Sequence, residues 1–139
     1  MKPIQRKGIK CTLSILLASS LGLLVSPLVS AQSYPNKPIK LIAPVAAGGG
    51  LDNLARKVAD RLSKNLGQTI IIENMGGGGG TIASQYVAKA APDGYTLLAS
   101  YVATHGTNPA VRKLPYDAIK DFTAIGMIGA TPNVLVINP

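Results

Sequence analysis

A short stretch, residues 39–56, limits the folds open to this chain, because it joins an aliphatic run, three glycines and an amphipathic run. The length and aliphatic content of residues 39–44 predict a buried strand. Glycines follow at 48–50, apolar residues then recur at helical spacing over 51–66, and Gly67 is placed to end that helix. The glycine loop lets the backbone approach a ligand closely, and the first-turn N–H groups of the helix have no partner inside it. Together they favour a small anion as ligand.

Residues 1–31 predict a secretory signal peptide that is cleaved from the mature protein. Four basic residues begin it, an apolar run covers 13–28, and small residues occupy 29–31. A transmembrane anchor is the alternative, but the apolar run is short and interrupted by serines and a proline. The single cysteine, Cys11, lies in this leader, so we expect no disulfide in the mature chain.

The mature chain, residues 32–139, is long enough for one small domain. It keeps ten of the 14 Lys and Arg residues and all six acidic residues, a balance of +4. These basic residues are dispersed and not interleaved with aromatics, so the sequence does not favour nucleic-acid binding.

Strands and helices alternate along the mature chain. Further strands are expected at 69–73 and 95–99, a second helix after Thr81, a helical turn at 108–111, and two last strands at 123–128 and 133–137. This order predicts an α/β domain with a mostly parallel sheet and helices on both faces. Ligands of such sheets bind beyond the carboxyl ends of the strands.

Three strand-end loops therefore carry the candidate ligand-binding residues. We expect contacts from Ala46, Ala47, Gly48, Gly49, Gly50 and Asp52 in the first loop, from Gly77, Gly78, Gly79, Gly80 and Thr81 in the second, and from Ser100, Thr104 and His105 in the third. A single glycine run could equally be a plain turn. Three such loops at one sheet edge favour a site.

Nucleotide-binding and enzymatic functions find little support in these loops. A P-loop needs Gly-Lys-Ser/Thr, but Gly80 is followed directly by Thr81, and the glycines at 48–50 lack the third glycine of a dinucleotide motif. The single histidine, His105, has no evident Ser-His-Asp partners, and no cluster has metal-ligand spacing. We expect neither an enzyme nor a cofactor; phosphate-ester chemistry is a weak third alternative that rests on the glycine loops alone.

The segments around these loops resemble the extracytoplasmic solute receptors of the tripartite tricarboxylate transporter system, the Bug receptors. The similarity runs from Tyr34 to Pro139 and is carried by the following segments: residues 43–56, 73–80, 90–98, 104–109, 113–117, 120–122 and 132–136. It implies a periplasmic-binding-protein fold with two α/β domains that close on a small carboxylate. It also implies that the three loops named above hold the ligand, and that membrane transporter subunits or a sensor are the partners.

Two departures from the family pattern concern the ligand and the length. Val45 and two alanines stand where the family has an aromatic and prolines, and Leu51 stands where a hydroxyl residue is common. The resemblance further implies a second domain, so we expect residues 32–139 to be an N-terminal domain truncated near the first interdomain crossover. The alternative to a periplasmic carboxylate receptor is a truncated remnant that binds nothing.

Overall fold

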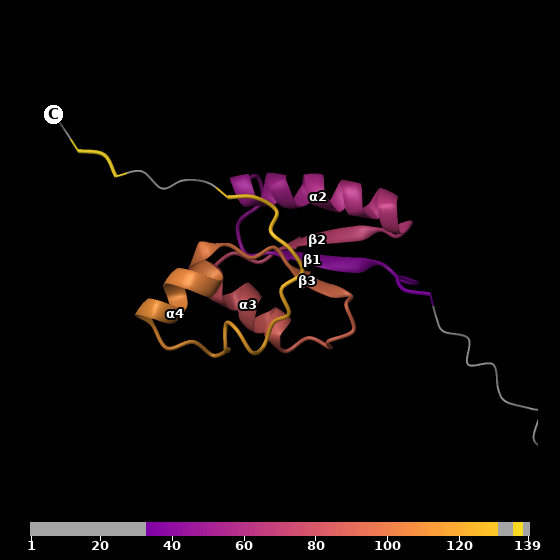
Figure 1. Ribbon diagram of the computed structural model, residues 1–139. Helices are drawn as coiled ribbons and strands as arrows, with labels where there is room; N and C mark the ends of the chain where they lie inside the picture. Colours follow the sequence, from indigo (N-terminus) through magenta and orange to yellow (C-terminus); the bar gives the residue numbers. More distant parts are fainter. Residues whose placement is uncertain (1–32, 131–134, 138–139) are drawn as a thin grey trace, which may run out of the picture. The chain divides into compact units, whose positions relative to one another are not determined.

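Strand β1 (Ile39–Ala43) is the centre of a three-stranded sheet with the order β2-β1-β3 (Figure 1). β2 (Ile70–Asn74) and β3 (Thr96–Leu98) both run parallel to it. The computed structural model describes residues 33–130 and 135–137, so the predicted leader (1–31) lies outside the described residues. Within them, the predicted α/β class with a parallel sheet is confirmed.

Two helices cover opposite faces of this sheet (Figure 1). α2 (Gly50–Leu66) packs on β1 and β2, and α3 (Thr81–Ala88) packs on β3 and β1. α2 ends at Gly67, whose φ of 66° is the left-handed C-terminal geometry that glycine adopts readily, as the sequence predicts. Among the described residues, no helix has the length and apolarity that a membrane crossing requires.

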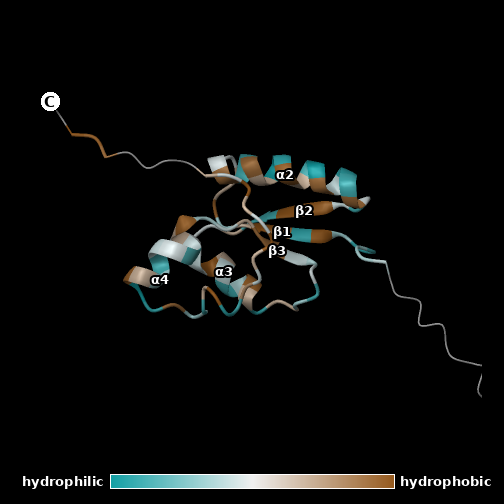
Figure 2. Cartoon of the chain, viewed as in Figure 1, coloured by the Kyte–Doolittle hydropathy of each residue, from teal (hydrophilic) through white to brown (hydrophobic). Residues whose placement is uncertain are grey.

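The core between α2 and the sheet is built from small and aliphatic side chains. Leu41 of β1 packs with Ala55 and Ala59 of α2 and with Ala99, and Leu51, Ile70, Ile72 and Leu97 border this cluster. Figure 2 shows hydrophobic residues along β1 and β2, and alternating hydrophilic and hydrophobic residues along α2. Apolar residues of 51–66 therefore form the side of α2 that packs on the sheet.

The buried face of α3 agrees with the sequence pattern only in part. The apolar spacing places Ile82, Ala83, Tyr86, Val87 and Ala90 on one face. Ala83 is fully buried as this predicts, but Ile82 and Tyr86 are 56% and 41% exposed, and Ser84, which is not on that face, is fully buried. Small side chains let a helix lie close to its neighbours, and α3 packs on the rest of the domain through the small residues Ala83 and Ser84.

The predicted strand at 123–128 is wrong. These residues have no regular secondary structure, and Ile125 and Met127 are 80% and 86% exposed. A strand requires a neighbour for its backbone hydrogen bonds, and no described strand lies in register with this segment. The predicted strand at 133–137 lies partly outside the described residues; its described part, 135–137, forms no strand.

The chain beyond β3 forms two consecutive helical turns. η2 (Ala103–Thr107) is a single turn of π-helix, where the sequence suggests a loop, and α4 (Asn108–Val111) follows it directly, as expected. Pro109 lies in the first turn of α4, where its missing N–H costs no intrahelical bond.

Candidate functional site

Three loops leave the carboxyl ends of the parallel strands and so begin at the same edge of the sheet. The first loop (residues 44–49) joins β1 to α2. The second loop (residues 75–80) joins β2 to α3 and ends in the 3₁₀ turn η1 (Gly78–Gly80). The third loop (residues 99–105) leads from β3 into η2. Each loop carries residues that the sequence predicts as ligand contacts.

Gly80 is the point where the three loops meet. A Cβ atom added to Gly80 would lie 2.5 Å from Thr104 Cγ2 and 3.2 Å from both Pro44 Cβ and Tyr101 Cε1. Gly80 therefore brings the second loop against the first and third loops at a distance that excludes a side chain.

Further contacts join the second loop to its neighbours. A Cβ atom on Gly76 would lie 3.4 Å from the amide nitrogen of Ala46 in the first loop. Asn108, a buried residue of α4, donates its side-chain N–H to the Gly79 carbonyl at 2.8 Å. The second loop is thus held from both sides, although its sequence is mostly glycine.

The backbone of the second loop explains its composition. Gly77, Gly78, Gly79 and Gly80 have φ angles of 117°, 57°, 65° and 86°, a run of positive values that other residues adopt only with strain. The Thr81 hydroxyl donates to the Gly78 carbonyl at 2.8 Å and closes the turn. The glycine run therefore specifies one turn that leads into α3.

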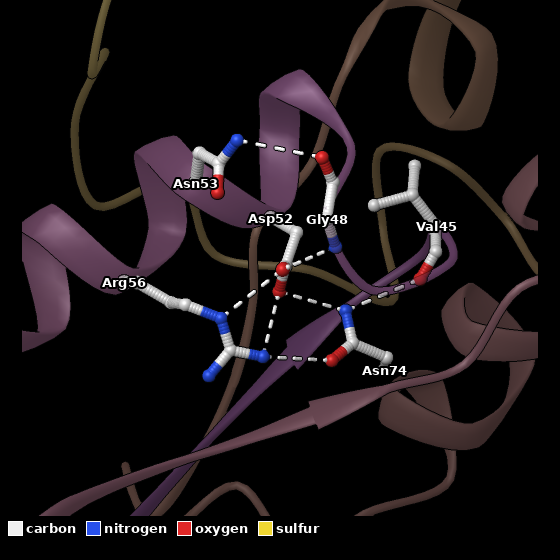
Figure 3. A network of polar contacts seen from close by, with 6 residues as sticks. All are labelled: Val45, Gly48, Asp52, Asn53, Arg56 and Asn74. Carbon is white, nitrogen blue, oxygen red and sulfur yellow. Dashed lines mark hydrogen bonds and ion pairs between the residues drawn. The ribbon is translucent and has the colours of Figure 1, made fainter.

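A polar network fixes the first loop, with the Asp52 carboxylate at its centre (Figure 3). Oδ2 of Asp52 accepts the Gly48 amide at 2.8 Å and Arg56 Nε at 3.0 Å. Oδ1 accepts Asn74 Nδ2 at 2.9 Å and lies 3.0 Å from Arg56 Nη2. Asn74 also donates to the Val45 carbonyl at 3.3 Å, so β2 and the first loop share this network.

The Asp52 side chain is 2% exposed, yet it is held in the ionised state. The hydrogen bond from Arg56 has the largest effect, and those from the Gly48 amide and Asn74 add to it. Together they lower the pKa of Asp52 from 3.8 to about 2. Burial acts in the opposite direction but is outweighed. Asp52 therefore carries a full negative charge at neutral pH, balanced by Arg56.

Thr104 organises the third loop. Its hydroxyl donates to the Tyr101 carbonyl at 2.7 Å and accepts the Tyr101 amide at 3.1 Å. The same hydroxyl lies 2.9 Å from His105 Nδ1. Ser100 Oγ lies 3.0 Å from the same nitrogen. Burial lowers the pKa of His105, which favours its neutral form.

Aromatic side chains from residues 116–122 support the third loop. The Tyr116 hydroxyl donates to the Thr104 carbonyl at 2.8 Å, and the Phe122 ring packs edge-on against His105 and Tyr116, with centroids 4.6 and 5.8 Å apart. A surface hollow of about 580 Å³ opens beside them, lined by His105, Pro109, Arg112, Leu114, Pro115, Tyr116, Asp117, Ala118 and Ile119. It shares only His105 with the predicted contacts, so it is not the place where the three loops meet.

The predicted contact residues fall into three groups by exposure. Those exposed to solvent are Ala46, Ala47, Gly48, Gly50, Gly77, Gly78, Gly79 and Ser100. Those partly exposed are Gly49, Thr81 and His105, and those buried are Asp52, Gly80 and Thr104. The loops therefore present backbone on their outer side, while the buried side chains hold the loops together.

Backbone amides at the start of α2 are open. The Asn53 amide donates to Gly49 and the Gly48 amide to Asp52, whereas the amides of Ala46, Ala47, Gly49 and Gly50 make no hydrogen bond to the described residues. These groups lie where the positive end of the helix dipole favours an anion. Within residues 33–130 and 135–137, no group of three or more His, Cys, Asp or Glu side chains could hold a metal ion.

Sequence reasoning missed the side chains that shape the loops. Arg56 lies one helical turn after Asp52, and this spacing is a usable signal for an ion pair. Asn74, Asn108 and Tyr116 act across 22, 29 and 12 residues, and no local pattern marks such distant partners.

Residues 54–139 match the model of a family described as the tripartite tricarboxylate transporter family receptor. A protein from the TAR-I ttuE-ttuC′ intergenic region of Agrobacterium vitis is 43% identical over 105 residues, which cover 76% of this chain and 30% of that protein. BugT of Bordetella pertussis is 40% identical over 114 residues, covering 80% of this chain and 35% of BugT. The chain thus spans about a third of the length of these relatives.

Two solved structures share the fold with high sequence identity. MatC from Rhodopseudomonas palustris, solved with bound malate, is 46% identical with a TM-score of 0.62, over 65% of this chain and 31% of MatC. A structure described as a periplasmic transporter is 50% identical with the same TM-score of 0.62, over 63% of this chain and 30% of that one.

Proposed function

Because this chain belongs to the tripartite tricarboxylate transporter receptor family, we propose that it is the ligand-holding part of a periplasmic receptor for a small carboxylate. The observation that carries the proposal is the meeting of three strand-end loops at Gly80, together with the open amides of Gly49 and Gly50 where the first loop enters α2. This edge is where an α/β sheet binds its ligand. MatC, which shares the fold, binds malate.

In this proposal the ligand carboxylate accepts hydrogen bonds from the amides of Ala46, Ala47, Gly49 and Gly50. The exposed glycines of the second loop and Ser100 complete the polar surface. Recognition is by backbone groups and requires no metal or other cofactor. We propose binding and release without chemistry, so the protein is not an enzyme.

The proposed setting follows from the same family. The leader at 1–31 directs the chain to the periplasm, and membrane transporter subunits or a sensor receive the loaded receptor. Nucleic acid is not a partner. In this proposal a second domain forms the other wall of the cleft. The relatives are longer than the matched region, which leaves room in them for such a domain.

A second candidate is a remnant that binds nothing. Ile125, Met127 and Leu135 are 80%, 86% and 96% exposed, and large exposed apolar side chains favour association over solubility. This candidate is distinguished from the first by whether the chain binds a carboxylate at all.

An NMR titration of the uniformly ¹⁵N-labelled chain with malate tests the proposal. We expect saturable shifts of the amides of Gly49 and Gly50, with smaller shifts at 77–79. Dimethyl malate, which keeps the carbon skeleton but has no negative charge, is the control and should leave these amides unchanged. If malate, citrate and glutamate all leave these amide shifts unchanged at millimolar concentration, the chain is a remnant that binds no carboxylate.

A further inference from the structure

We propose that Asp52, Arg56 and Asn74 are positioning residues that hold the first loop ready for the ligand without touching it. We call these three side chains the brace (Figure 3). The inference rests on the proposed carboxylate-binding function, because it assigns the brace to that site. It differs from the prediction made for Asp52 from the sequence, which expects a direct ligand contact.

The Asp52 carboxylate is occupied by its own neighbours. Its two oxygens accept hydrogen bonds from the Gly48 amide, Asn74 Nδ2 and Arg56 Nε at 2.8 to 3.0 Å, and Oδ1 forms an ion pair with Arg56 Nη2 at 3.0 Å, so these partners lie along most of the about four lone-pair directions that a carboxylate offers. Its side chain is also 2% exposed. A ligand cannot reach these oxygens without breaking the network.

The brace divides the amides of the first loop into two sets. The Gly48 amide is used internally by Asp52, whereas the amides of Gly49 and Gly50, next along the chain, remain open. Asp52 fixes Gly48 and thereby fixes the direction in which the next two N–H groups point. Arg56 balances the Asp52 charge, so an incoming anion is not repelled by a carboxylate at the helix start.

Asn74 joins the first and second loops. It is the last residue of β2, and its side chain bonds the Val45 carbonyl, Asp52 and Arg56 at once. The next residue, Met75, donates its amide to the Ala43 carbonyl at 2.8 Å. The two loops therefore leave the sheet from one hydrogen-bonded point, and a change at Asn74 affects both.

Removing the brace should lower ligand affinity, because the first loop would then be flexible in the ligand-free protein and would have to become ordered on binding. The first loop contains two alanines and two glycines, and its exposed residues make few other contacts. Fixing the backbone of one freed residue on binding weakens affinity by roughly ten-fold. A variant that frees one or two residues should bind about ten- to a hundred-fold more weakly.

Three variants of the full chain test this inference: Asn74→Ala, Arg56→Lys and Asp52→Asn. Arg56→Lys keeps the charge but loses the planar guanidinium that donates to Asp52 Oδ2 and Asn74 Oδ1 and pairs with Asp52 Oδ1. Asp60→Asn is the matched control, because it breaks an exposed ion pair of the same i,i+4 spacing, with Lys64, on the same helix. Malate affinity is measured by calorimetry, and the ligand-free amide spectrum and the unfolding temperature of each variant are recorded.

The expected result is a ten- to hundred-fold loss of malate affinity in Asn74→Ala and Arg56→Lys, with Asp60→Asn unchanged. The ligand-free spectra should change at Val45–Gly50 while the sheet amides keep their shifts, which a general loss of stability would not produce. Folded brace variants that bind malate within two-fold of the wild type would overturn the inference. Arg56→Lys keeps the test valid should Asp52→Asn not fold.

A different result would separate this inference from the proposed function. If the wild type itself binds no carboxylate, the proposed function is wrong, and the ligand-free spectra then decide whether the brace orders the loop. Unchanged amide shifts at Gly48 and Gly49 in Asn74→Ala would refute the positioning role.

Discussion

The α-carbon of Gly80 lies so close to Thr104 that a single methyl group does not fit between them: a Cβ on Gly80 would be 2.5 Å from Thr104 Cγ2. The two residues belong to different loops, and each is buried. Their contact keeps the second and third loops at a fixed separation, and the surface proposed to bind the carboxylate depends on that separation.

Gly80→Ala should destabilise the fold more than Gly67→Ala. Both glycines have positive φ, 86° and 66°, and alanine in that conformation costs about 1–2 kcal/mol. A Cβ at Gly67 meets nothing within 4 Å, whereas one at Gly80 overpacks against Thr104 and adds about 1–3 kcal/mol. Urea denaturation measures both, and Thr104→Ser, which removes the obstructing methyl group, should recover part of the loss in Gly80→Ala. Equal losses at the two glycines would contradict the contact.

Tyr116→Phe should lower the free energy of unfolding by about 1 kcal/mol, because the Thr104 carbonyl loses a buried hydrogen bond. Tyr34→Phe is the control: its hydroxyl donates to the Gly94 carbonyl at the same 2.8 Å, but the residue is 57% exposed, so water can replace it. Thermal unfolding followed by circular dichroism compares them. A smaller effect in Tyr116→Phe than in Tyr34→Phe would show that residues 116–122 do not support the third loop.

Asp52 should make the fold sensitive to acid in a defined window. Its pKa is about 2 in the folded chain and near 3.8 in the unfolded chain, so the unfolded state takes up the proton first as the pH falls. The stabilisation is complete above about pH 3.8 and is lost progressively toward pH 2. Unfolding measured between pH 5 and pH 2 should show this loss in the wild type and in Asp60→Asn, and a shallower loss in Asp52→Asn.

His105 should add a pH dependence near neutrality. Burial lowers its folded pKa below 6.5, so below that pH the unfolded chain binds a proton that the folded chain resists. Stability should fall as the pH drops through 6.5, and His105→Gln, which cannot be protonated, should flatten this part of the curve. A slope of equal size in the variant would assign the effect to other groups.

The sequence predicts the elements whose signals are local. The apolar run of β1, the periodicity of α2 and the glycine at 67 each report a structure made within a few residues, and all three are confirmed. The prediction of a strand at 123–128 is wrong because β-propensity describes how well residues suit a sheet, whereas a strand also needs a neighbouring strand to pair with.

The candidate site shows the same limit. The sequence identifies three loops that begin at one sheet edge, as the parallel pairing requires. It does not show that Asp52 is buried, since a carboxylate in a first helical turn is usually exposed, and its burial depends on Asn74, 22 residues away. Whether the predicted residues contact a ligand stays a prediction.

The central position of β1 also sets the order in which the chain can fold. β1 pairs with β2 through a crossover of about 30 residues and with β3 through one nearly twice as long, and closing the longer loop is entropically harder. During synthesis, β1, α2 and β2 are complete before β3 is made. We therefore expect the first loop, held by Asn74, to reach its native shape early, and Gly80 to meet Thr104 last.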